Sequence, residues 1–128
     1  MKGALLFLLL ALSLPNSFAT EKPMQNGSIV VLPVSGPVSE VQFFFLRRVL
    51  KNAESADAAA LILDMDTPGG DLKSTEKIVQ MLGKSPIPTY TYVNSNAGSA
   101  GALIALGTKK IFMSPVSAIG AAAPVAGS

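Results

Sequence analysis

Apolar residues recur along the chain in two alternating arrangements, short continuous runs and helical spacings. Runs rich in aliphatic or β-branched residues predict strands at residues 29–34, 59–65, 89–93 and 111–113. Apolar positions at helical spacing, or small helix-forming residues, predict helices at residues 39–54, 71–83 and 100–106. This alternation predicts an α/β fold in which right-handed crossovers build a mainly parallel sheet.

Polar residues mark where the predicted helices begin and end. Ser39 followed by Gln42 resembles a capping box, Asp71 suits the start of the second helix, and Gly83 ends it. Three consecutive phenylalanines, residues 43–45, cannot all face one core. We expect at least one to be exposed or covered by a partner, which makes them a candidate oligomer contact; a wide buried face is the alternative.

Two glycine-rich turns, each between a predicted strand and a predicted helix, are the candidate functional features. In Asp66-Thr67-Pro68-Gly69-Gly70, the glycines allow positive φ and close approach of a ligand, so the loop can point amides outward. In Gly98-Ser99-Ala100-Gly101, Ser99 lies at a helix start, where free N–H groups and the helix dipole favour a developing oxyanion. Serine at a helix start is also a common N-cap, and Pro-Gly-Gly a common turn. The residues alone therefore leave a structural and a catalytic interpretation open.

The order of the motifs along the chain is more specific than either turn. The first turn, a helix, Ser85-Pro86-Ile87-Pro88, a strand, the second turn and a helix are followed by a segment at residues 117–125. This order resembles the Clp-protease/crotonase superfamily, and within it the membrane-bound NfeD-type serine proteases, over about residues 28–126. The resemblance implies a ββα superhelix for a domain at residues 28–128, and implies that this domain is incomplete at its C-terminal end.

The same resemblance implies a catalytic site. Ser99 is the implied nucleophile, and the backbone N–H groups of Gly70 and Ala100 form the implied oxyanion hole. The loops that support these groups contribute Pro68, Gly69, Gly98 and Gly101. No cofactor and no metal are implied.

The general base of this implied site is missing. Clp-type proteases use a histidine, but the chain contains none, and the corresponding position falls near Ala122. NfeD-type proteases resemble signal-peptide peptidases in using a lysine, about forty residues beyond the serine, which would lie past Ser128. Lys109 and Lys110 follow the Ser99 helix, and ten helical residues span about 15 Å, too far for proton transfer. We therefore expect both lysines to be solvated loop charges, and this chain alone to be inactive.

Composition and the N-terminal residues limit the number of domains, the class of partner and the location of the protein. Of 128 residues, 49% are hydrophobic and 14% charged, which allows one domain, and a net charge of +2 gives no support to nucleic-acid binding. Residues 1–19 combine Lys2, an apolar stretch shorter than the roughly 20 residues that span a bilayer, and a small-residue cleavage site at Ala19. They predict a signal peptide, with an uncleaved anchor as the alternative. A linker at residues 20–27 then leads into an exported, extracytoplasmic domain that is membrane-associated in the full-length protein.

Acidic residues offer a second candidate site at the end of the strand at residues 59–65. Asp64 and Asp66 are two residues apart, so their side chains point the same way, as a metal site or acid–base pair requires. No third ligand is near in sequence. We therefore expect them to hydrogen-bond loop amides and to fix the turn.

Three classes of function follow. The first is an exported serine endopeptidase with a Ser/Lys dyad, implied by the resemblance to cut apolar segments of membrane-associated proteins, such as a stomatin-like partner, and to act as a homo-oligomer. The second is a noncatalytic module that binds peptide or assembles with partners. The third is a crotonase-like acyl-CoA enzyme, which export and the lack of a basic cluster for nucleotide phosphates disfavour.

Overall fold

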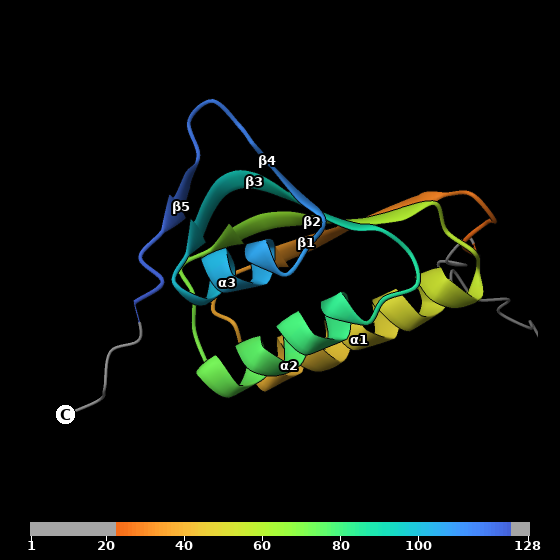
Figure 1. Cartoon of the computed structure of the whole chain (residues 1–128), viewed down its shortest axis with the longest axis horizontal. Coiled ribbons are helices and arrows are strands. Elements are labelled where there is room, and N and C mark those ends of the chain that lie inside the picture. Colours follow the sequence, from red (N-terminus) through yellow and green to blue (C-terminus); the bar gives the residue numbers. More distant parts are fainter. Residues whose placement is uncertain (1–22, 124–128) are drawn as a thin grey trace, which may run out of the picture.

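The computed structural model describes residues 23–123, so the predicted signal peptide and part of the predicted linker lie outside the described residues. Strands and helices alternate through most of this range (Figure 1). In chain order they are β1 (Ile29–Ser35), α1 (Glu40–Ser55), β2 (Ala60–Thr67), α2 (Leu72–Gly83), β3 (Thr89–Gly98), α3 (Ala100–Leu106), β4 (Lys110–Met113) and β5 (Ala118–Gly120). The predicted α/β alternation is confirmed.

The strands form one parallel sheet in the order β1-β2-β3-β4. The register between β2 and β3 shifts after the pair Met65–Val93, so that Thr67 pairs with Ala97. β3 therefore continues to Gly98, beyond the predicted end at residue 93. This added length gives β5 an edge to pair with at residues 96–98, after β4 has paired with residues 90–93.

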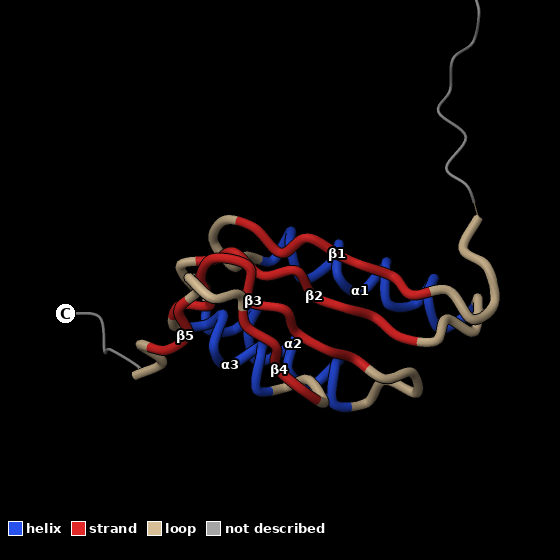
Figure 2. Tube along the Cα trace, turned by 90° about the horizontal axis from the view of Figure 1, so that it is seen from above, coloured by secondary structure: helices blue, strands red, loops and turns tan. Residues whose placement is uncertain are grey.

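All three helices cover the same face of the sheet, which leaves the other face open within the described residues (Figures 1 and 2). The core lies between these two layers, where fully buried residues of the helices pack against fully buried residues of the strands. They include Leu46, Ile78 and Ile104 from the helices, and Leu61, Leu63, Met65 and Val93 from the strands. The continuous apolar run at 59–65 is typical of a buried strand, but from Leu61 onward β2 buries only alternate residues, because no helix of the described residues covers its second face.

The helix starts follow the predicted capping residues with one difference. The Ser39 hydroxyl accepts the N–H of Gln42 (3.3 Å), but the Gln42 side chain donates to the carbonyl of Ser35 (3.2 Å), so only half of a capping box forms. The Asp71 carboxylate accepts both the N–H (2.7 Å) and the hydroxyl (2.6 Å) of Ser74. These hydrogen bonds, that of the Ser74 hydroxyl first, lower the pKa of Asp71.

The phenylalanine run divides between core and surface. Phe43 packs against the core, whereas Phe44 is 50% and Phe45 53% exposed, which confirms that the three do not share one buried face. Arg47 lies over the rings of Phe43 and Phe44, at 5.8 and 5.3 Å from their centroids. Among residues 23–123, no helix is both long enough and apolar enough to span a bilayer.

Candidate functional site

The first glycine-rich turn begins where β2 ends. Thr67 is fully buried; its hydroxyl donates to the carbonyl of Gly36 (2.6 Å) and accepts the N–H of Gly69 (3.2 Å). Gly69 has a φ of +106°, a conformation that a residue with a Cβ rarely adopts. The threonine hydroxyl thus holds a backbone shape that only glycine takes without strain.

Gly70 is held against Val38 by a parallel backbone bridge. The Val38 N–H donates to the carbonyl of Gly69 (2.8 Å), and the Asp71 N–H donates to the carbonyl of Val38 (2.8 Å). The Gly69 carbonyl and the Gly70 N–H belong to one trans peptide, so they point in opposite directions. The Gly70 N–H is therefore aimed away from Val38. A side chain at Gly70 would collide with the Val38 backbone, since its Cβ would lie 2.5 Å from the Val38 nitrogen.

Ser99 occupies a strained turn between β3 and α3. Its φ of 50° and ψ of −113° are unusual for a residue other than glycine, and such conformations cost about 1–3 kcal/mol. The Ser99 N–H donates to the carbonyl of Gly120 in β5 (2.7 Å). Ser99 stands at the N-cap position of α3, but its side chain makes no capping hydrogen bond among the described residues. A strained strand-to-helix turn that projects a serine hydroxyl is the geometry of a nucleophile elbow.

The two turns lie directly against each other. A Cβ built on Gly69 would lie 2.7 Å from the Cβ of Ser99 and 3.1 Å from the backbone nitrogen of Ala100. A Cβ on Gly98 would lie 3.0 Å from the carbonyl oxygen of Pro68. The first distance leaves no room for a side chain at Gly69, and the second would require the neighbours of Gly98 to shift. The glycines of both turns are therefore needed for the close approach of two segments that are distant in sequence.

A pocket of about 400 Å³ opens where the turns meet. It is lined by Gly70, Leu72, Ser99, Ala100, Leu103, Ala122 and Ala123. Ala100 is the first residue of α3, and the first N–H groups of a helix have no partner within that helix. The structure thus brings Gly70, Ser99 and Ala100 to one pocket, while Pro68, Gly69, Gly98 and Gly101 form the packed turns behind it.

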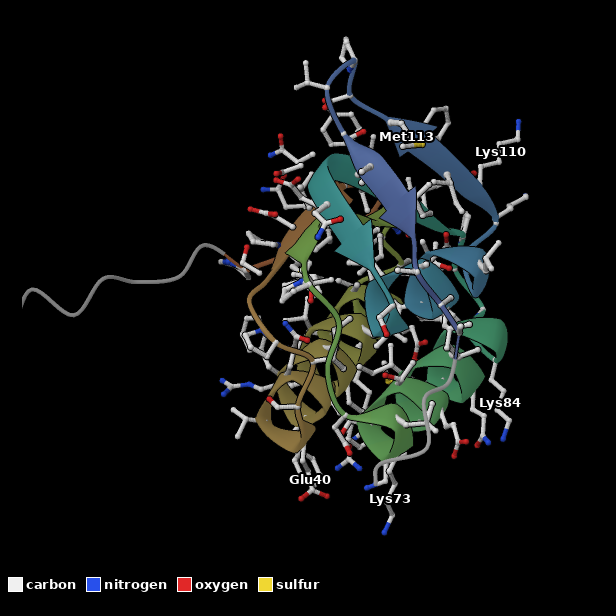
Figure 3. All side chains as sticks on the ribbon, turned by 90° about the vertical axis from the view of Figure 1, so that its left-hand side faces the viewer. Glu40, Lys73, Lys84, Lys110 and Met113 are labelled. Carbon is white, nitrogen blue, oxygen red and sulfur yellow. The ribbon has the colours of Figure 1, made fainter. Side chains whose placement is uncertain are left out.

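Among residues 23–123, no residue that lines this pocket is titratable. Lys73, next to the lining residue Leu72, points its side chain away from the molecule (Figure 3). Lys109 is exposed, and its N–H donates to the carbonyl of Thr89 (2.8 Å). Thr89 is the first residue of β3, whereas Ser99 follows the last residue of that strand. Lys110 is the first residue of β4, so the expectation that it is a loop charge is wrong. Neither lysine lines the pocket.

The acidic pair of β2 lies outside this pocket. Asp64 and Asp66 alternate with the buried Met65 and Thr67, so their side chains point the same way, toward the open side of the sheet, as expected. The expectation that they hydrogen-bond loop amides is wrong for Asp64, whose buried Oδ1 has no hydrogen-bond partner among the described residues. Within residues 23–123, no group of three or more acidic, histidine or cysteine side chains is arranged to hold a metal ion.

Several lining residues were not assigned from the sequence. Leu72 and Leu103 give the pocket apolar walls, and Leu72 is 52% exposed although it is a large aliphatic residue. Leu103 follows Ser99 by one helical turn, a spacing that would have placed it on the same face. Ala122 had a signal from the family resemblance, which places the Clp-type histidine position near it. For Ala123 there was no comparable signal, because the path of the chain after β5 depends on the sheet.

A family model and individual relatives of known sequence indicate the same protein family for this chain. A model of the NfeD1b N-terminal domain matches residues 28–128. Membrane protein NfeD1b of Bacillus subtilis is 42% identical over 103 residues, 80% of this chain and 24% of that protein. Membrane-bound protease PH1510 of Pyrococcus horikoshii is 36% identical over 113 residues, 86% of this chain and 26% of that protein. The chain thus spans about a quarter of the length of these curated relatives.

Solved structures agree with these relatives. A variant of the 1510-N membrane-bound stomatin-specific protease with serine replaced by alanine has a TM-score of 0.76 and 34% identity, covering 80% of this chain and 51% of that one. A second variant, with lysine replaced by alanine and a bound substrate peptide, has a TM-score of 0.76 and 35% identity, covering 80% and 48%.

More distant structures share the fold alone. ClpP1 of Listeria monocytogenes is 17% identical with a TM-score of 0.59, covering 61% of this chain and 46% of that one. An enoyl-CoA hydratase/isomerase family protein of Silicibacter pomeroyi is 19% identical with a TM-score of 0.62, covering 74% and 50%. The fold is therefore that of the Clp/crotonase group, as the sequence predicted.

Proposed function

Because the chain belongs to the NfeD1b N-terminal domain family, we propose that it carries the nucleophile and oxyanion hole of an exported serine endopeptidase. The observation that carries this proposal is the pocket shared by Ser99, Gly70 and Ala100. A serine protease uses a hydroxyl and amide donors that converge on one carbonyl, and these groups lie on two turns in contact.

In the proposed reaction, the Ser99 oxygen attacks the scissile carbonyl carbon and forms a tetrahedral intermediate. The N–H groups of Gly70 and Ala100 donate to the oxyanion that develops on the former carbonyl oxygen. The hydroxyl proton passes to a general base and from there to the leaving amine, which departs as the C–N bond breaks. Water then hydrolyses the acyl-enzyme and regenerates Ser99. Removing one oxyanion donor from such a site slows the reaction by about 10²–10³-fold.

The proposed base is a lysine outside residues 23–123. The chain has no histidine, and none of the described residues that line the pocket is titratable. Two solved structures of the stomatin-specific relative carry substitutions at a serine and at a lysine, and these substitutions support a Ser/Lys pairing. We expect the 128-residue chain by itself to have negligible turnover.

The proposed substrate is a polypeptide with an apolar segment. Leu72, Leu103 and the two alanines at 122 and 123 make the pocket wall apolar, which favours small or aliphatic side chains. A relative is named a stomatin-specific protease, so a stomatin-like membrane protein is the partner that we propose. We place the domain outside the cytoplasm, at the membrane, and as a homo-oligomer.

The second candidate is a noncatalytic peptide-binding or assembly module with the same pocket. The lack of a titratable side chain among the described lining residues favours it for this polypeptide alone. A crotonase-like acyl-CoA enzyme is less well supported, because the pocket offers no cation for nucleotide phosphates and the acyl-CoA enzymes are similar in fold alone.

Labelling with a fluorophosphonate probe, which reacts with activated serines, tests the proposal. We expect no labelling of the 128-residue chain, and labelling of a version extended along the natural polypeptide through the expected lysine. Ser99→Ala should abolish that labelling, and Ser95→Ala, on the exposed side of β3, should leave it unchanged. An extended chain that folds but stays unlabelled would contradict the protease and favour the binding module.

A further inference from the structure

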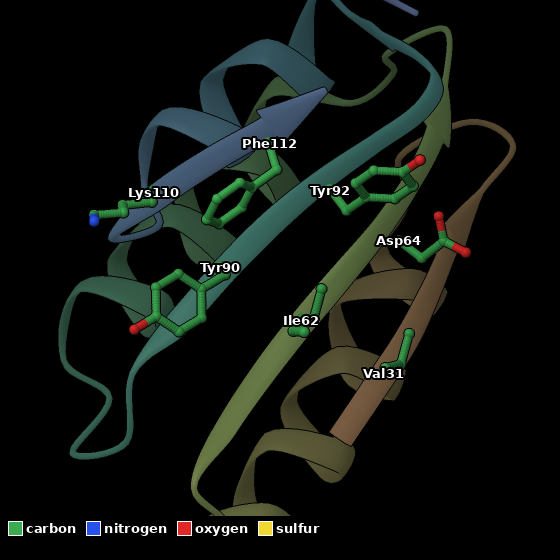
Figure 4. Close-up of a pocket in the computed structure, with 7 residues that line it drawn as sticks. All are labelled: Val31, Ile62, Asp64, Tyr90, Tyr92, Lys110 and Phe112. Carbon is green, nitrogen blue, oxygen red and sulfur yellow. The ribbon is translucent and has the colours of Figure 1, made fainter. Parts of the chain in front are cut away.

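Basic residues are concentrated on the first two helices. Six of the ten lysines and arginines of the chain belong to α1, α2 or the residue that caps the end of α2: Arg47, Arg48, Lys51, Lys73, Lys77 and Lys84. Figure 3 shows Lys73 and Lys84 on the helix side of the molecule and Lys110 on the sheet side. The pocket on the open face of the sheet is balanced in charge instead, because one acid, Asp64, and one base, Lys110, line it (Figure 4).

Three of these cations surround a shallow pocket between α1 and α2, which lie side by side (Figure 1). This basic pocket has a volume of about 240 Å³ and is lined by Phe43, Arg47, Lys77, Gln80, Met81 and Lys84. No acidic residue is among the described residues that line it. The three cations and the Gln80 amide all donate hydrogen bonds, so the pocket suits an anion with several acceptor oxygens, such as a phosphate group.

A phenylalanine ring holds two of the cations in place. The Arg47 guanidinium lies 5.8 Å and the Lys77 ammonium group 5.4 Å from the centroid of the Phe43 ring. Lys77 also pairs with Glu40 (3.1 Å), but Arg47 and Lys84 form no ion pair within residues 23–123. A ring face attracts a cation without cancelling its charge. The charges of Arg47 and Lys84 are therefore left for a ligand.

Exposed apolar side chains stand beside these cations on α1. Val41 is 79% exposed, and Phe44 and Phe45 are each about half exposed. Arg48 is also exposed and follows Phe44 by four residues and Phe45 by three, so it shares the outer side of α1 with them. Phenylalanine and arginine together on the outer side of a helix are typical of contact with an anionic bilayer. A bilayer presents phosphates and an apolar layer together, which matches both kinds of side chain.

We infer that the outer side of α1 and α2 binds the headgroups of anionic phospholipids in a bilayer. Arg47, Lys77 and Lys84 donate to a headgroup phosphate in the basic pocket, and Phe44 and Phe45 enter the boundary between headgroups and acyl chains. This contact is additional to the reaction proposed for Ser99. It rests only on the location at the membrane that is proposed above.

α2 links this surface to the candidate active site. Its first residue, Leu72, lines the pocket of Ser99, whereas Lys77 lines the basic pocket. Five helical residues separate Leu72 from Lys77, or about 8 Å along the helix axis. A bilayer bound to the basic pocket therefore lies near the pocket of Ser99, where the apolar segment of a membrane-associated substrate can reach it.

Co-sedimentation of the 128-residue chain with lipid vesicles tests the inference. The probes are vesicles of phosphatidylcholine alone and vesicles of equal parts phosphatidylcholine and phosphatidylglycerol, and the readout is the ratio of the two partition coefficients. The apolar residues 1–19 bind both kinds of vesicle, so their contribution cancels in the ratio. One cation at an anionic surface strengthens binding by roughly fivefold, so three cations predict a ratio of roughly a hundred at low salt. The ratio should fall as salt is added.

Charge variants locate the binding surface. Arg47→Gln and Lys84→Gln should each lower the ratio by roughly fivefold, and the two together by roughly 25-fold. Lys110→Gln is the matched control, because it removes the same charge on the sheet side, and it should change the ratio by less than about twofold. Glu40→Gln removes the acid that pairs with Lys77 and should raise the ratio by up to about fivefold.

Equal binding to the two kinds of vesicle would overturn the inference, and so would a Lys110→Gln chain as weak as Arg47→Gln. Phe45→Ser should lower partition into the anionic vesicles by roughly tenfold. Poly-glutamate that binds as tightly as these vesicles and does not respond to Phe45→Ser would also overturn the inference, because an acidic protein would then be the partner. If Arg47→Gln unfolds the chain by circular dichroism, Lys84→Gln and Glu40→Gln carry the test.

The outcome for this surface is separate from the outcome for the proposed reaction. Ser99 labelling in the extended chain reports the activated nucleophile, and vesicle binding reports the helix surface. Loss of labelling with vesicle binding intact would count against the hydrolase alone, and the reverse against this surface alone.

Discussion

Gly69→Ala tests the contact on which the candidate site depends. The new methyl group would lie 2.7 Å from the Cβ of Ser99, 2.9 Å from the carbonyl oxygen of Gly98 and 3.1 Å from the nitrogen of Ala100. Two of these neighbours are backbone atoms that cannot turn aside. The substitution must therefore push the two turns apart or strain both.

The expected cost has two parts. An alanine at a φ of +106° carries a backbone penalty of about 1–2 kcal/mol. Overpacking against a rigid neighbour adds about 1–3 kcal/mol. Together they predict a loss of about 2–5 kcal/mol in the free energy of unfolding, and at about 4 °C per kcal/mol the melting temperature should fall by at least about 8 °C.

Urea and thermal unfolding, followed by circular dichroism, measure this loss. Gly83→Ala is the matched control, because nothing lies within 4 Å of its added methyl group and a helical glycine is replaced. That variant should be up to about 1 kcal/mol more stable than the parent. A Gly69→Ala chain as stable as the parent would refute the close approach of the two turns, and with it the geometry of the pocket.

Three further predictions concern stability. Thr67→Val removes the hydroxyl that bonds both Gly36 and Gly69, and should cost about 1–3 kcal/mol in urea unfolding, most of which Thr67→Ser should recover. Leu63→Ala, at a fully buried position, should lower the free energy of unfolding by about 2–5 kcal/mol. Val41→Ala, on the exposed side of α1, should leave it within about 0.5 kcal/mol of the parent. Equal losses would mean that the sheet–helix core is misidentified. Hydrogen bonds from Ser74 hold the pKa of Asp71 below its usual 3.8, so this carboxylate stabilises the fold above that value and the contribution is lost as the pH falls through the lower folded-state pKa. Asp71→Asn keeps an acceptor that does not titrate, and its unfolding midpoint between about pH 5 and pH 2 should fall less steeply than that of the parent.

Local patterns predicted most of the elements. The helix expected at residues 100–106 coincides with α3, and the other predicted helices and strands match within two residues, except for β3. The full length of β3 and the presence of β5 were not predicted, and both have the same cause. β3 continues to Gly98 and β5 forms at all because residues 96–98 pair with residues 118–120, a contact that no short window of sequence contains. Likewise Gln42 completes no capping box because the end of β1 lies within reach of its side chain.

The sequence by itself determined where most of the elements lie and where the two glycine-rich turns interrupt them, because hydrophobic periodicity, glycine and proline act on the local backbone. It also determined that no histidine can serve as a base, since composition can be read without a structure. The catalytic roles of Ser99, Gly70 and Ala100 stay predictions. Only the tertiary structure decided that Gly69 touches Ser99, that Leu72 and Leu103 wall the pocket, and that Asp64 and Lys110 share an open face. The physical reason is that parallel crossovers bring the ends of successive strands to one edge of the sheet. These contacts therefore join residues that are far apart in the chain, and local sequence patterns do not specify them.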